Sequence, residues 1–274
     1  MKPAPFDYVA SRDSAHALAL LGDSDGMGKL CSGTMSLGPM LNLRLAQPTR
    51  LIDVSRLDAL LACERRGDVL RLGAAVTHAR IEDALVPDVT HGLLASVAGG
   101  IAYRAVRNRG TLGGSLAHAD PCADWVTTMC LLDASMILVG RTGQRVVQAS
   151  DFFLGPFTTA LAEDELLAAI DVPCFGPQGR WAYRKTCRKP GEFAEAIAAV
   201  WVDPSQGIAR VALGALDGMP QVIGGPDAVK ALRTQAGVNA ALDAAGVQDA
   251  YERQLQSVMI GRALADIDSF PSQL

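Results

Sequence analysis

The sequence predicts an α+β protein with two small N-terminal lobes and a smaller C-terminal domain containing a three-stranded antiparallel sheet and helices. Strand and helix signals alternate in short units through residues 1–55, and a hairpin signal opens the second lobe over 56–174. After residue 175, successive strand-like segments are joined by short turns rich in Gly and Pro, which is typical of an antiparallel meander. We therefore expect domains over 1–174 and 175–274.

The first lobe is expected to be a small α/β unit. Ser11 or Asp13 precedes its first helix and can cap it. Ser36 can cap its second helix, and Pro39 lies in the first turn, where a missing N–H costs nothing. The expected elements are the strand FDYVA (6–10), the helix SAHALALL (14–21), the strand GKLCSG (28–33), the helix SLGPMLNLR (36–44) and the strand RLIDVS (50–55).

The second lobe mixes strands and helices. Two β-rich runs within 60–76 flank the turn Arg66-Gly67-Asp68, which indicates a hairpin. Thr77 and Thr90 stand where the next two helices begin, and both are able to cap a helix. The other expected elements are helices over 77–85, 90–102 and 121–134 and strands over 134–140 and 144–150.

The C-terminal domain is expected to begin near residue 175 with a loop rich in Gly and Pro. Its strands are joined by short turns, and amphipathic helices follow them. The expected elements are the strands WAYRKTC (181–187), FAEAIAAVWV (193–202) and GIARVALGAL (207–216) and the helices VKALRTQ (229–235), VNAALDAA (238–245) and DAYERQLQSVMIGRALADI (249–267).

Composition and charge disfavour several classes of protein. The formal net charge is −4, whereas nucleic-acid binding depends on clustered Lys and Arg, so we expect no nucleic-acid partner. No window approaches the roughly 20 apolar residues of a membrane span, and the N-terminal segment lacks an apolar signal region, so a cytoplasmic protein is expected. The six cysteines include no C-x-x-C pair, which disfavours zinc and iron–sulfur ligation, and we interpret them as small buried hydrophobes.

Two glycine-containing loops are the candidate ligand-binding elements. GTMSLG (33–38) lies between an expected strand and helix, where free backbone N–H groups can bind an anion, although a plain capped helix explains the same pattern. GTLGGS (110–115) holds Gly113 and Gly114 side by side. Paired glycines remove Cβ and permit a positive φ, so the chain can lie against a ligand; a tight turn at a strand end is the alternative.

Two carboxylates follow the second loop. Asp120 precedes Pro121, the expected order of an N-cap and a first helical residue, so we interpret Asp120 mainly as a cap. Asp124 lies one turn further along and is not needed for the cap. Because a carboxylate repels a phosphate, Asp124 is expected to bind hydroxyl groups. The stretch predicts a ligand with both an anionic part and a polyol part.

SGTMSLGPMLNLR and RNRGTLGGSLAHADPCAD resemble the two flavin-binding segments of the FAD-carrying medium subunit of molybdenum hydroxylases, a group that includes carbon monoxide dehydrogenase and xanthine dehydrogenase. The resemblance extends over most of the chain through RLIDVS, LRLGAAVTHARIE, ELLAAIDVP, YRKTCRKPGEFAEAI and YERQLQSVMIGRAL. It implies two lobes of the vanillyl-alcohol-oxidase or PCMH type that hold FAD, followed by the C-terminal domain.

The resemblance also implies roles for individual residues. The FAD pyrophosphate is expected on Ser32–Ser36 and on Thr111–Gly114. Lys185 is expected near the isoalloxazine, Leu167 beside the ring and adenine region, and Phe193 against one flavin face. No catalytic residue and no metal ligand is expected in this chain. The complete candidate cofactor-binding set is Ser32, Gly33, Thr34, Met35, Ser36, Leu37, Ile101, Thr111, Gly113, Gly114, Asp120, Asp124, Leu167, Lys185 and Phe193.

Asp124 is similar to the family residue that binds the ribityl chain, which agrees with the charge argument above. The first loop departs from the family pattern Ala-Gly-Gly-Gln/His-Ser, because the run here is Ser32-Gly33-Thr34-Met35-Ser36. Loss of the second glycine disfavours a positive φ at position 34, and Met35 replaces a polar side chain. The Thr34 hydroxyl can compensate as a donor.

The function implied by the resemblance is electron transfer within a heterotrimer. In such enzymes a large molybdopterin subunit hydroxylates the substrate, and a small subunit with two 2Fe–2S clusters conducts the electrons. This chain is expected to hold FAD as the medium subunit and to pass the electrons to an external acceptor. Both other subunits are therefore expected partners.

Two alternatives stay open from the sequence. A stand-alone flavin oxidoreductase of the same fold would need its own substrate pocket, and residues 175–274 are few for an elaborate substrate lid. A non-catalytic nucleotide-binding protein would bind no flavin. Hydrolysis is disfavoured because His118 has no nucleophilic Ser or Cys beside it, and we interpret His118 as structural or ligand-lining. Arg107 and Arg109 are unassigned.

Overall fold

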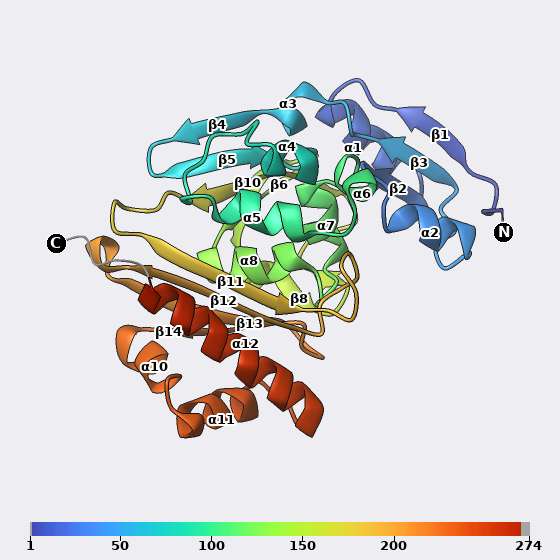
Figure 1. Ribbon diagram of the computed structural model, residues 1–274. Coiled ribbons are helices and arrows are strands. Elements are labelled where there is room, and N and C mark those ends of the chain that lie inside the picture. Colours follow the sequence, from blue (N-terminus) through green and yellow to red (C-terminus); the bar gives the residue numbers. More distant parts are fainter. Residues whose placement is uncertain (1, 270–274) are drawn as a thin grey trace.

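The first lobe is built on three parallel strands in the order β1-β3-β2 (Figure 1). The computed structural model describes residues 2–269. Asp13 caps the first helix, because its carboxylate accepts a hydrogen bond from the His16 N–H. The elements are β1 (Asp7–Ala10), α1 (Ser14–Gly22), β2 (Gly28–Cys31), α2 (Leu37–Asn42) and β3 (Arg50–Asp53). The predicted succession of strands and helices is confirmed in this lobe.

The second lobe contains a five-stranded antiparallel sheet in the order β4-β5-β10-β6-β7. The predicted hairpin is confirmed, and Gly67 in its turn has a φ of +61°. The strands are β4 (Cys63–Arg66), β5 (Val69–Gly73), β6 (Ser135–Gly140), β7 (Gly143–Gln148) and β10 (Glu165–Pro173). The central strand β10 was not predicted, because burial on both faces and a register shift between Leu167 and Ala169 remove the alternating pattern of a strand.

Short helices connect and cover this sheet. Thr77 caps α4 by accepting a hydrogen bond from the Arg80 N–H. The residue that precedes α5 is Gly92, while the Thr90 hydroxyl accepts a hydrogen bond from the Leu94 N–H. The elements are α3 (Asp58–Leu61), α4 (His78–Glu82), α5 (Leu93–Gly100), α6 (Arg104–Arg107), α7 (Leu112–His118), α8 (Asp124–Leu132), α9 (Ala149–Phe152) and the hairpin β8 (Phe153–Gly155) and β9 (Thr158–Thr159).

The C-terminal sheet has four antiparallel strands rather than the three predicted. The additional strand β14 is a four-residue edge strand, too short to give a clear sequence signal. Three helices follow it, as predicted. The elements are β11 (Arg180–Thr186), β12 (Ala196–Asp203), the 3₁₀ helix η1 (Pro204–Gln206), β13 (Ile208–Gly214), β14 (Gln221–Gly224), α10 (Pro226–Ala231), α11 (Gln235–Ala244) and α12 (Ala250–Ser269).

Helices α5, α7 and α8 lie between the five-stranded and the four-stranded sheet, and α10, α11 and α12 cover the other face of the C-terminal sheet (Figure 1). The largest core joins both sheets, since Leu72 of β5, Trp125 of α8 and Trp201 of β12 belong to one cluster of buried residues. All residues of α8 are buried. The start of α8 is thereby enclosed between the two sheets. Within residues 2–269, no helix has the length and apolarity that crossing a membrane requires.

Candidate functional site

The two predicted glycine loops lie directly against each other. Gly33 follows β2 and is buried, and a Cβ at this position would overlap the carbonyl oxygen of Arg109 and crowd the Cα of Gly110. Only glycine therefore allows the loop of the first lobe to approach the backbone of the second loop. Segments about 75 residues apart in the sequence thus form one surface, as the family resemblance implies.

The first loop presents unused hydrogen-bond donors. The backbone N–H groups of residues 32–36 donate to no residue that the structure describes, although the carbonyls of Thr34 and Ser36 accept hydrogen bonds from Gly38 and Met40. The Ser32 hydroxyl is buried and likewise has no partner among residues 2–269. Unsatisfied donors of this kind are costly unless a ligand or water uses them. The loop therefore has the chemistry of an anion site.

Thr34 adopts the left-handed conformation, with a φ of 60°. A β-branched residue is uncommon there, and such strain costs on the order of 1–3 kcal/mol. Position 34 therefore has a positive φ although it carries Thr in place of the family's second glycine. Ser36 precedes α2 but makes no side-chain cap, so its hydroxyl is not consumed by the helix.

The second loop differs from its prediction, because Gly113 and Gly114 lie in the first turn of α7 and neither has a positive φ. Thr111 caps this helix by accepting a hydrogen bond from the Gly114 N–H at 3.2 Å. A Cβ at Gly113 would overlap the Ala74 side chain, whereas Gly114 is exposed and a Cβ there would meet only Thr111. Gly113 thus allows α7 to pack closely against Ala74. Gly114 leaves the backbone of α7 exposed, without a side chain above it.

Buried contacts anchor the second loop from beneath. The His78 N–H donates to the carbonyl of Gly110 at 2.9 Å, and the indole N–H of Trp125 donates to Nδ1 of His78 at 3.0 Å. Burial, assisted by the positive charge of Arg107, lowers the pKa of His78 from 6.5 to about 4. His78 is therefore neutral at physiological pH and accepts the indole hydrogen bond. No sequence signal singled out this residue.

Arg107 is a structural residue in this protein. Its guanidinium binds Glu82 at 2.8 Å and the carbonyls of Ile101 and Ala102 at 3.0 Å, so it fixes the turn that follows α5. Ile101 is half-buried at this turn. The side chain of Arg109 is exposed, while its backbone forms the contact with Gly33.

Asp124 is the first residue of α8 and is only 7% exposed. Its Oδ1 accepts hydrogen bonds from the Tyr183 hydroxyl and from Nζ of Lys185, both at 2.7 Å. Nζ of Lys185 also donates to the carbonyl of Gly100 at 2.8 Å. Burial, and then the charge of Asp124, raises the pKa of Tyr183 well above its usual value, so its hydroxyl stays protonated and donates.

The structure thus brings Asp124 of helix α8 and Lys185 of strand β11 together, and it adds Tyr183 of the same strand, which the sequence did not suggest. Tyr183 and Lys185 are two positions apart on β11, so their side chains point to the same face of the sheet. This spacing is the signal that would have connected Tyr183 with Lys185.

Asp120 does not cap α8, which corrects the prediction. Its carboxylate accepts a hydrogen bond from the Cys122 N–H, and its carbonyl accepts one from Ala123, so Asp120 forms a turn ahead of the helix. The residue that precedes α8 is Ala123, and Asp124 opens the helix. Pro121 therefore lies outside the helix rather than at its first position.

The remaining predicted residues have different surroundings. Leu167 is buried within the central strand β10, beside Leu138 in the sheet. Leu37 packs against the small core of the first lobe, and Met35 is half-buried. Phe193 is 60% exposed and lines a hollow formed by the loop that follows β11, the other lining residues being Arg188, Gly191, Glu192, Ala194 and Glu195.

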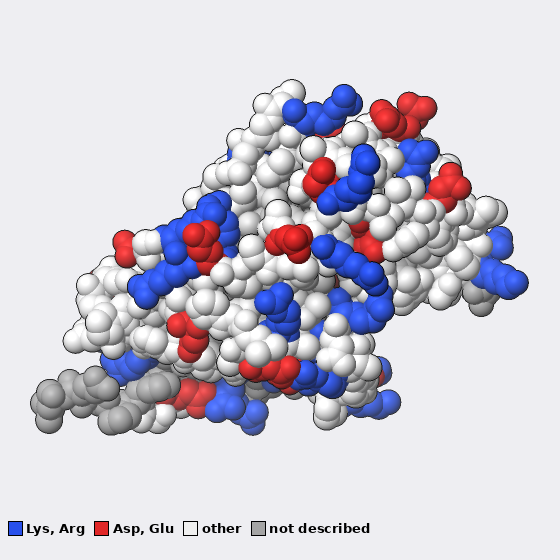
Figure 2. All heavy atoms as spheres, turned by 90° about the horizontal axis from the view of Figure 1, so that it is seen from above, with Lys and Arg blue, Asp and Glu red and all other residues white. Residues whose placement is uncertain are grey.

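Basic and acidic side chains are interspersed over the face that Figure 2 shows. Ion pairs in the protein include Arg104 with Asp83 and Arg145 with Glu165. His118 stands at the end of α7 with its ring 5.1 Å from that of Phe157. Among the described residues, no group of three or more His, Cys, Asp or Glu side chains is placed to hold a metal.

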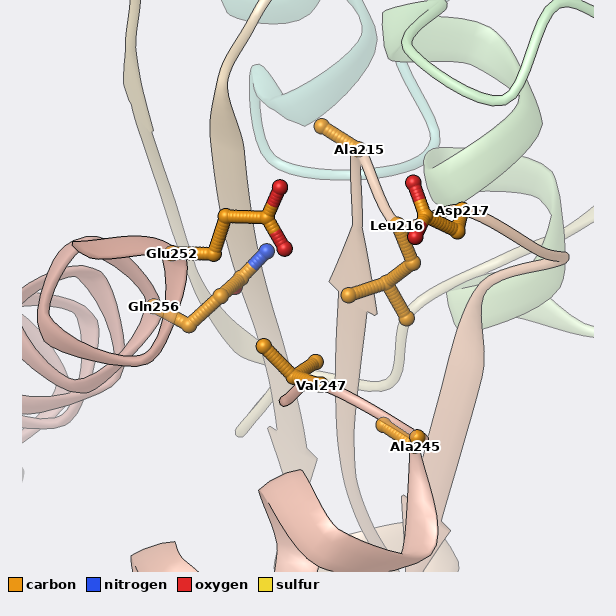
Figure 3. A pocket seen from close by; sticks show the side chains of 8 residues that line it. Ala215, Leu216, Asp217, Ala245, Val247, Glu252 and Gln256 are labelled. Atoms are coloured by element: carbon orange, nitrogen blue, oxygen red, sulfur yellow. The ribbon is translucent and has the colours of Figure 1, made fainter. Parts of the chain in front are cut away.

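A further hollow lies in the C-terminal domain (Figure 3), apart from the two loops. Gln256 is 1% exposed, and its Nε2 donates to the carbonyl of Gly214 at 2.8 Å, while its Oε1 has no partner among residues 2–269. Asp217 and Glu252 add negative charge, so this hollow does not suit an anionic ligand. Its lining residues are Ala215, Leu216, Asp217, Ala245, Gly246, Val247, Glu252 and Gln256.

The sequence of this chain is similar to those of known flavin-binding proteins. Residues 4–175 match the family described as FAD binding domain in molybdopterin dehydrogenase. The chain is 39% identical to the carbon monoxide dehydrogenase medium chain of Hydrogenophaga pseudoflava over 200 residues, which cover 73% of this chain and 70% of that protein. It is 36% identical to the nicotine 6-hydroxylase medium subunit of Paenarthrobacter nicotinovorans, with coverage of 83% and 80%.

Solved structures extend the match to almost the whole chain. A chain of carbon monoxide dehydrogenase from Hydrogenophaga pseudoflava superposes with a TM-score of 0.87 at 35% identity, covering 97% of this chain and 98% of that one. A chain of quinoline 2-oxidoreductase from Pseudomonas putida 86 has a TM-score of 0.84 at 30% identity, with the same coverage. The fold class predicted from the sequence is thereby confirmed. This chain belongs to the family of FAD-binding subunits of molybdenum hydroxylases, and it is an oxidoreductase subunit whose cofactor is FAD.

Proposed function

We propose that this chain is the FAD-carrying electron-transfer subunit of a molybdenum hydroxylase complex. It would take electrons from a small subunit with two 2Fe–2S clusters, which receives them from a large molybdopterin subunit, and pass them to an external acceptor. The relatives that support this assignment are named as medium subunits or medium chains, and one as a subunit beta. The chain spans 70–80% of the first three of these relatives.

The first loop is the observation that carries the proposal. Its backbone N–H groups at residues 32–36 and the buried Ser32 hydroxyl lack partners among the described residues. A pyrophosphate offers several oxygen acceptors and would satisfy these donors. Gly33 brings the loop against the backbone of the second loop, so both loops flank the same space. The residues present therefore fit FAD at its anionic centre.

The second loop and α8 fit the remainder of the cofactor. The backbone N–H groups of residues 112–114 already donate hydrogen bonds, in chain order to the carbonyls of Val76 and Ala74 and to the hydroxyl of Thr111. This loop therefore contributes the exposed backbone at Gly114, where no side chain would obstruct the cofactor, rather than free donors. Both donors that reach Asp124 bind its Oδ1. Its Oδ2 is available for a hydroxyl group of the ribityl chain.

FAD, when bound, accepts two electrons and releases them to an acceptor. The residues of this chain bind and orient it and control access to it. Lys185 places a positive charge beside Asp124 with 16% of its side chain exposed, where it would stabilise negative charge on the reduced ring. Phe193 is exposed in its loop and would shield one ring face from solvent and acceptors. We assign no general acid or base to this chain.

FAD titration of the full chain tests the site. Quenching of flavin fluorescence should show one binding site in the wild type, and Ser32→Ala should weaken FAD affinity about tenfold through loss of one hydrogen bond to a charged group. Ser96→Ala is the matched control, because Ser96 is exposed on α5, and its affinity should equal the wild-type value. Wild-type protein that binds no FAD would refute the proposal.

The subunit role requires a separate measurement. The chain purified under native conditions from its own cells should bring with it two further polypeptides, iron and molybdenum, which mass spectrometry and metal analysis detect. An isolated chain that oxidises its own organic substrate with full turnover would instead support a stand-alone flavin oxidoreductase. Purified protein without flavin absorbance and without FAD uptake would support a non-catalytic nucleotide-binding protein.

A further inference from the structure

The contact between α8 and β11 connects the candidate cofactor site with the C-terminal domain. Asp124 belongs to the FAD-binding region, whereas Tyr183 and Lys185 belong to the C-terminal sheet. Both of these side chains donate to the same oxygen, Oδ1 of Asp124, at 2.7 Å. Two donors on one oxygen determine the plane and the direction of a carboxylate, because they come from two different points of one strand.

We propose that Tyr183 is a positioning residue for FAD, which acts by orienting Asp124 across the contact between helix α8 and strand β11. This inference rests on the proposed function, since it assumes that Asp124 binds the ribityl hydroxyls. No described residue donates to Oδ2 of Asp124, and this atom is not among the buried side-chain oxygens that lack partners. Oδ2 therefore keeps some exposed surface, and its direction is set by the two donors on Oδ1.

The surroundings explain why a second donor is needed in addition to the lysine. The side chain of Asp124 is 8% exposed and that of Lys185 16%, so the ion pair is largely desolvated. A buried ion pair contributes little net stability, but it specifies an arrangement when its remaining hydrogen bonds are satisfied. The ammonium group of Lys185 donates hydrogen bonds both to Asp124 and to the carbonyl of Gly100. Tyr183 has its single hydroxyl donor directed at Asp124 alone.

The backbone at this point is fixed as well. Asp124 is the first residue of α8, and the Thr128 hydroxyl donates to its carbonyl at 2.8 Å within the first turn. On the other side, Tyr183 pairs with Ala199 and Lys185 pairs with Ile197 of β12, which are both buried. The freedom that remains is the side-chain rotation of Asp124. Tyr183 removes it.

A double-mutant cycle in FAD affinity tests this role. In the wild-type background, Tyr183→Phe should weaken FAD binding about tenfold, because a carboxylate that is no longer held in one orientation must be ordered when FAD binds. In the Asp124→Ala background, the same substitution should change FAD affinity less than twofold, because its effect passes through the missing carboxylate. An equal loss in both backgrounds would overturn the inference.

Two further measurements separate positioning from simple support of the fold. Tyr251→Phe is the matched control, because Tyr251 is 62% exposed on α12, and it should leave FAD affinity unchanged. The visible circular dichroism of bound flavin, recorded at saturating FAD, should change for Tyr183→Phe if the ribityl chain is reoriented, and an unchanged spectrum together with wild-type affinity would overturn the inference. Wild-type protein that binds no FAD would refute the proposed function itself.

Discussion

At the scale of single residues, the space around Gly33 determines how closely the two loops approach. Gly33→Ala should destabilise the protein by about 1–3 kcal/mol and reduce FAD retention, because its Cβ would overlap the carbonyl oxygen of Arg109. Gly38 is the matched control, since a Cβ there has open space within α2. Gly38→Ala should stabilise the protein by about 0.5–1 kcal/mol. Urea denaturation measures both, and equal stabilities of the two variants would contradict the described contact.

His78 predicts a pH dependence of stability. Burial lowers its pKa in the folded state to about 4 from 6.5, so the unfolded chain binds the proton more tightly. The stability from neutral His78 is complete above pH 6.5 and is lost as the pH falls toward 4, to an extent of roughly 3 kcal/mol. His78→Gln should flatten the curve of unfolding free energy against pH over this window. Parallel curves for wild type and variant would show that His78 is not the group responsible.

Side-chain type and spacing predict the chemistry of a residue more readily than its contacts. The sequence predicts from charge that Asp124 binds hydroxyl groups, and this stays a prediction; the structure shows that the two donors to its carboxylate both bind Oδ1. The prediction for Asp120 failed because the order Asp-Pro occurs in turns as well as at helix starts, and the helix begins at Asp124 instead. Gly113 is buried against Ala74, a packing contact that the sequence does not reveal, and its expected contact with the cofactor stays a prediction.

At the scale of elements, the packing of α8 against β13 holds the cofactor region on the C-terminal sheet. Gly214 lies so close to Thr127 that a Cβ at position 214 would overlap the threonine hydroxyl. Both residues belong to regular elements whose backbones are held by hydrogen bonds, so the strain cannot relax easily. The absence of a side chain at Gly214 therefore sets the distance between α8 and the sheet.

Gly214→Ala should destabilise the protein by about 1–3 kcal/mol through overpacking. The double variant Gly214→Ala with Thr127→Ala should recover most of this loss, because the second change removes the hydroxyl that the new methyl group would meet. Thermal denaturation of the three variants measures the coupling. Independent, additive effects would indicate that the two residues do not limit each other.

Elements with strong local signals were predicted, including the β4–β5 hairpin and α12. The strands β10 and β14 were missed for opposite reasons. β10 is buried on both faces and so lacks alternation, whereas β14 is an edge strand of only four residues. In both cases the neighbours in the sheet, rather than the local sequence, stabilise the extended conformation.

At the scale of the whole molecule, one core joins the FAD-binding region to the C-terminal sheet, and it contains both Trp125 and Trp201. FAD that binds only the folded chain should raise the free energy of unfolding by about 2.7 kcal/mol at a hundredfold excess over its dissociation constant. Because the core is shared, the tryptophan fluorescence should show a single transition that FAD moves to higher temperature. A melting temperature that does not respond to saturating FAD would contradict binding to the native state.

The sequence by itself determined the fold class, the family and the chemistry of the two loops, because turn residues, capping residues and carboxylates act through local backbone geometry and charge. Only the tertiary structure decided which atoms meet. It placed Gly33 against Arg109, directed Tyr183 and Lys185 to one oxygen of Asp124, and gave the donors of the first loop no partner among residues 2–269. These contacts join residues distant in the chain, and their geometry depends on how the two sheets pack around α8, which no local pattern records.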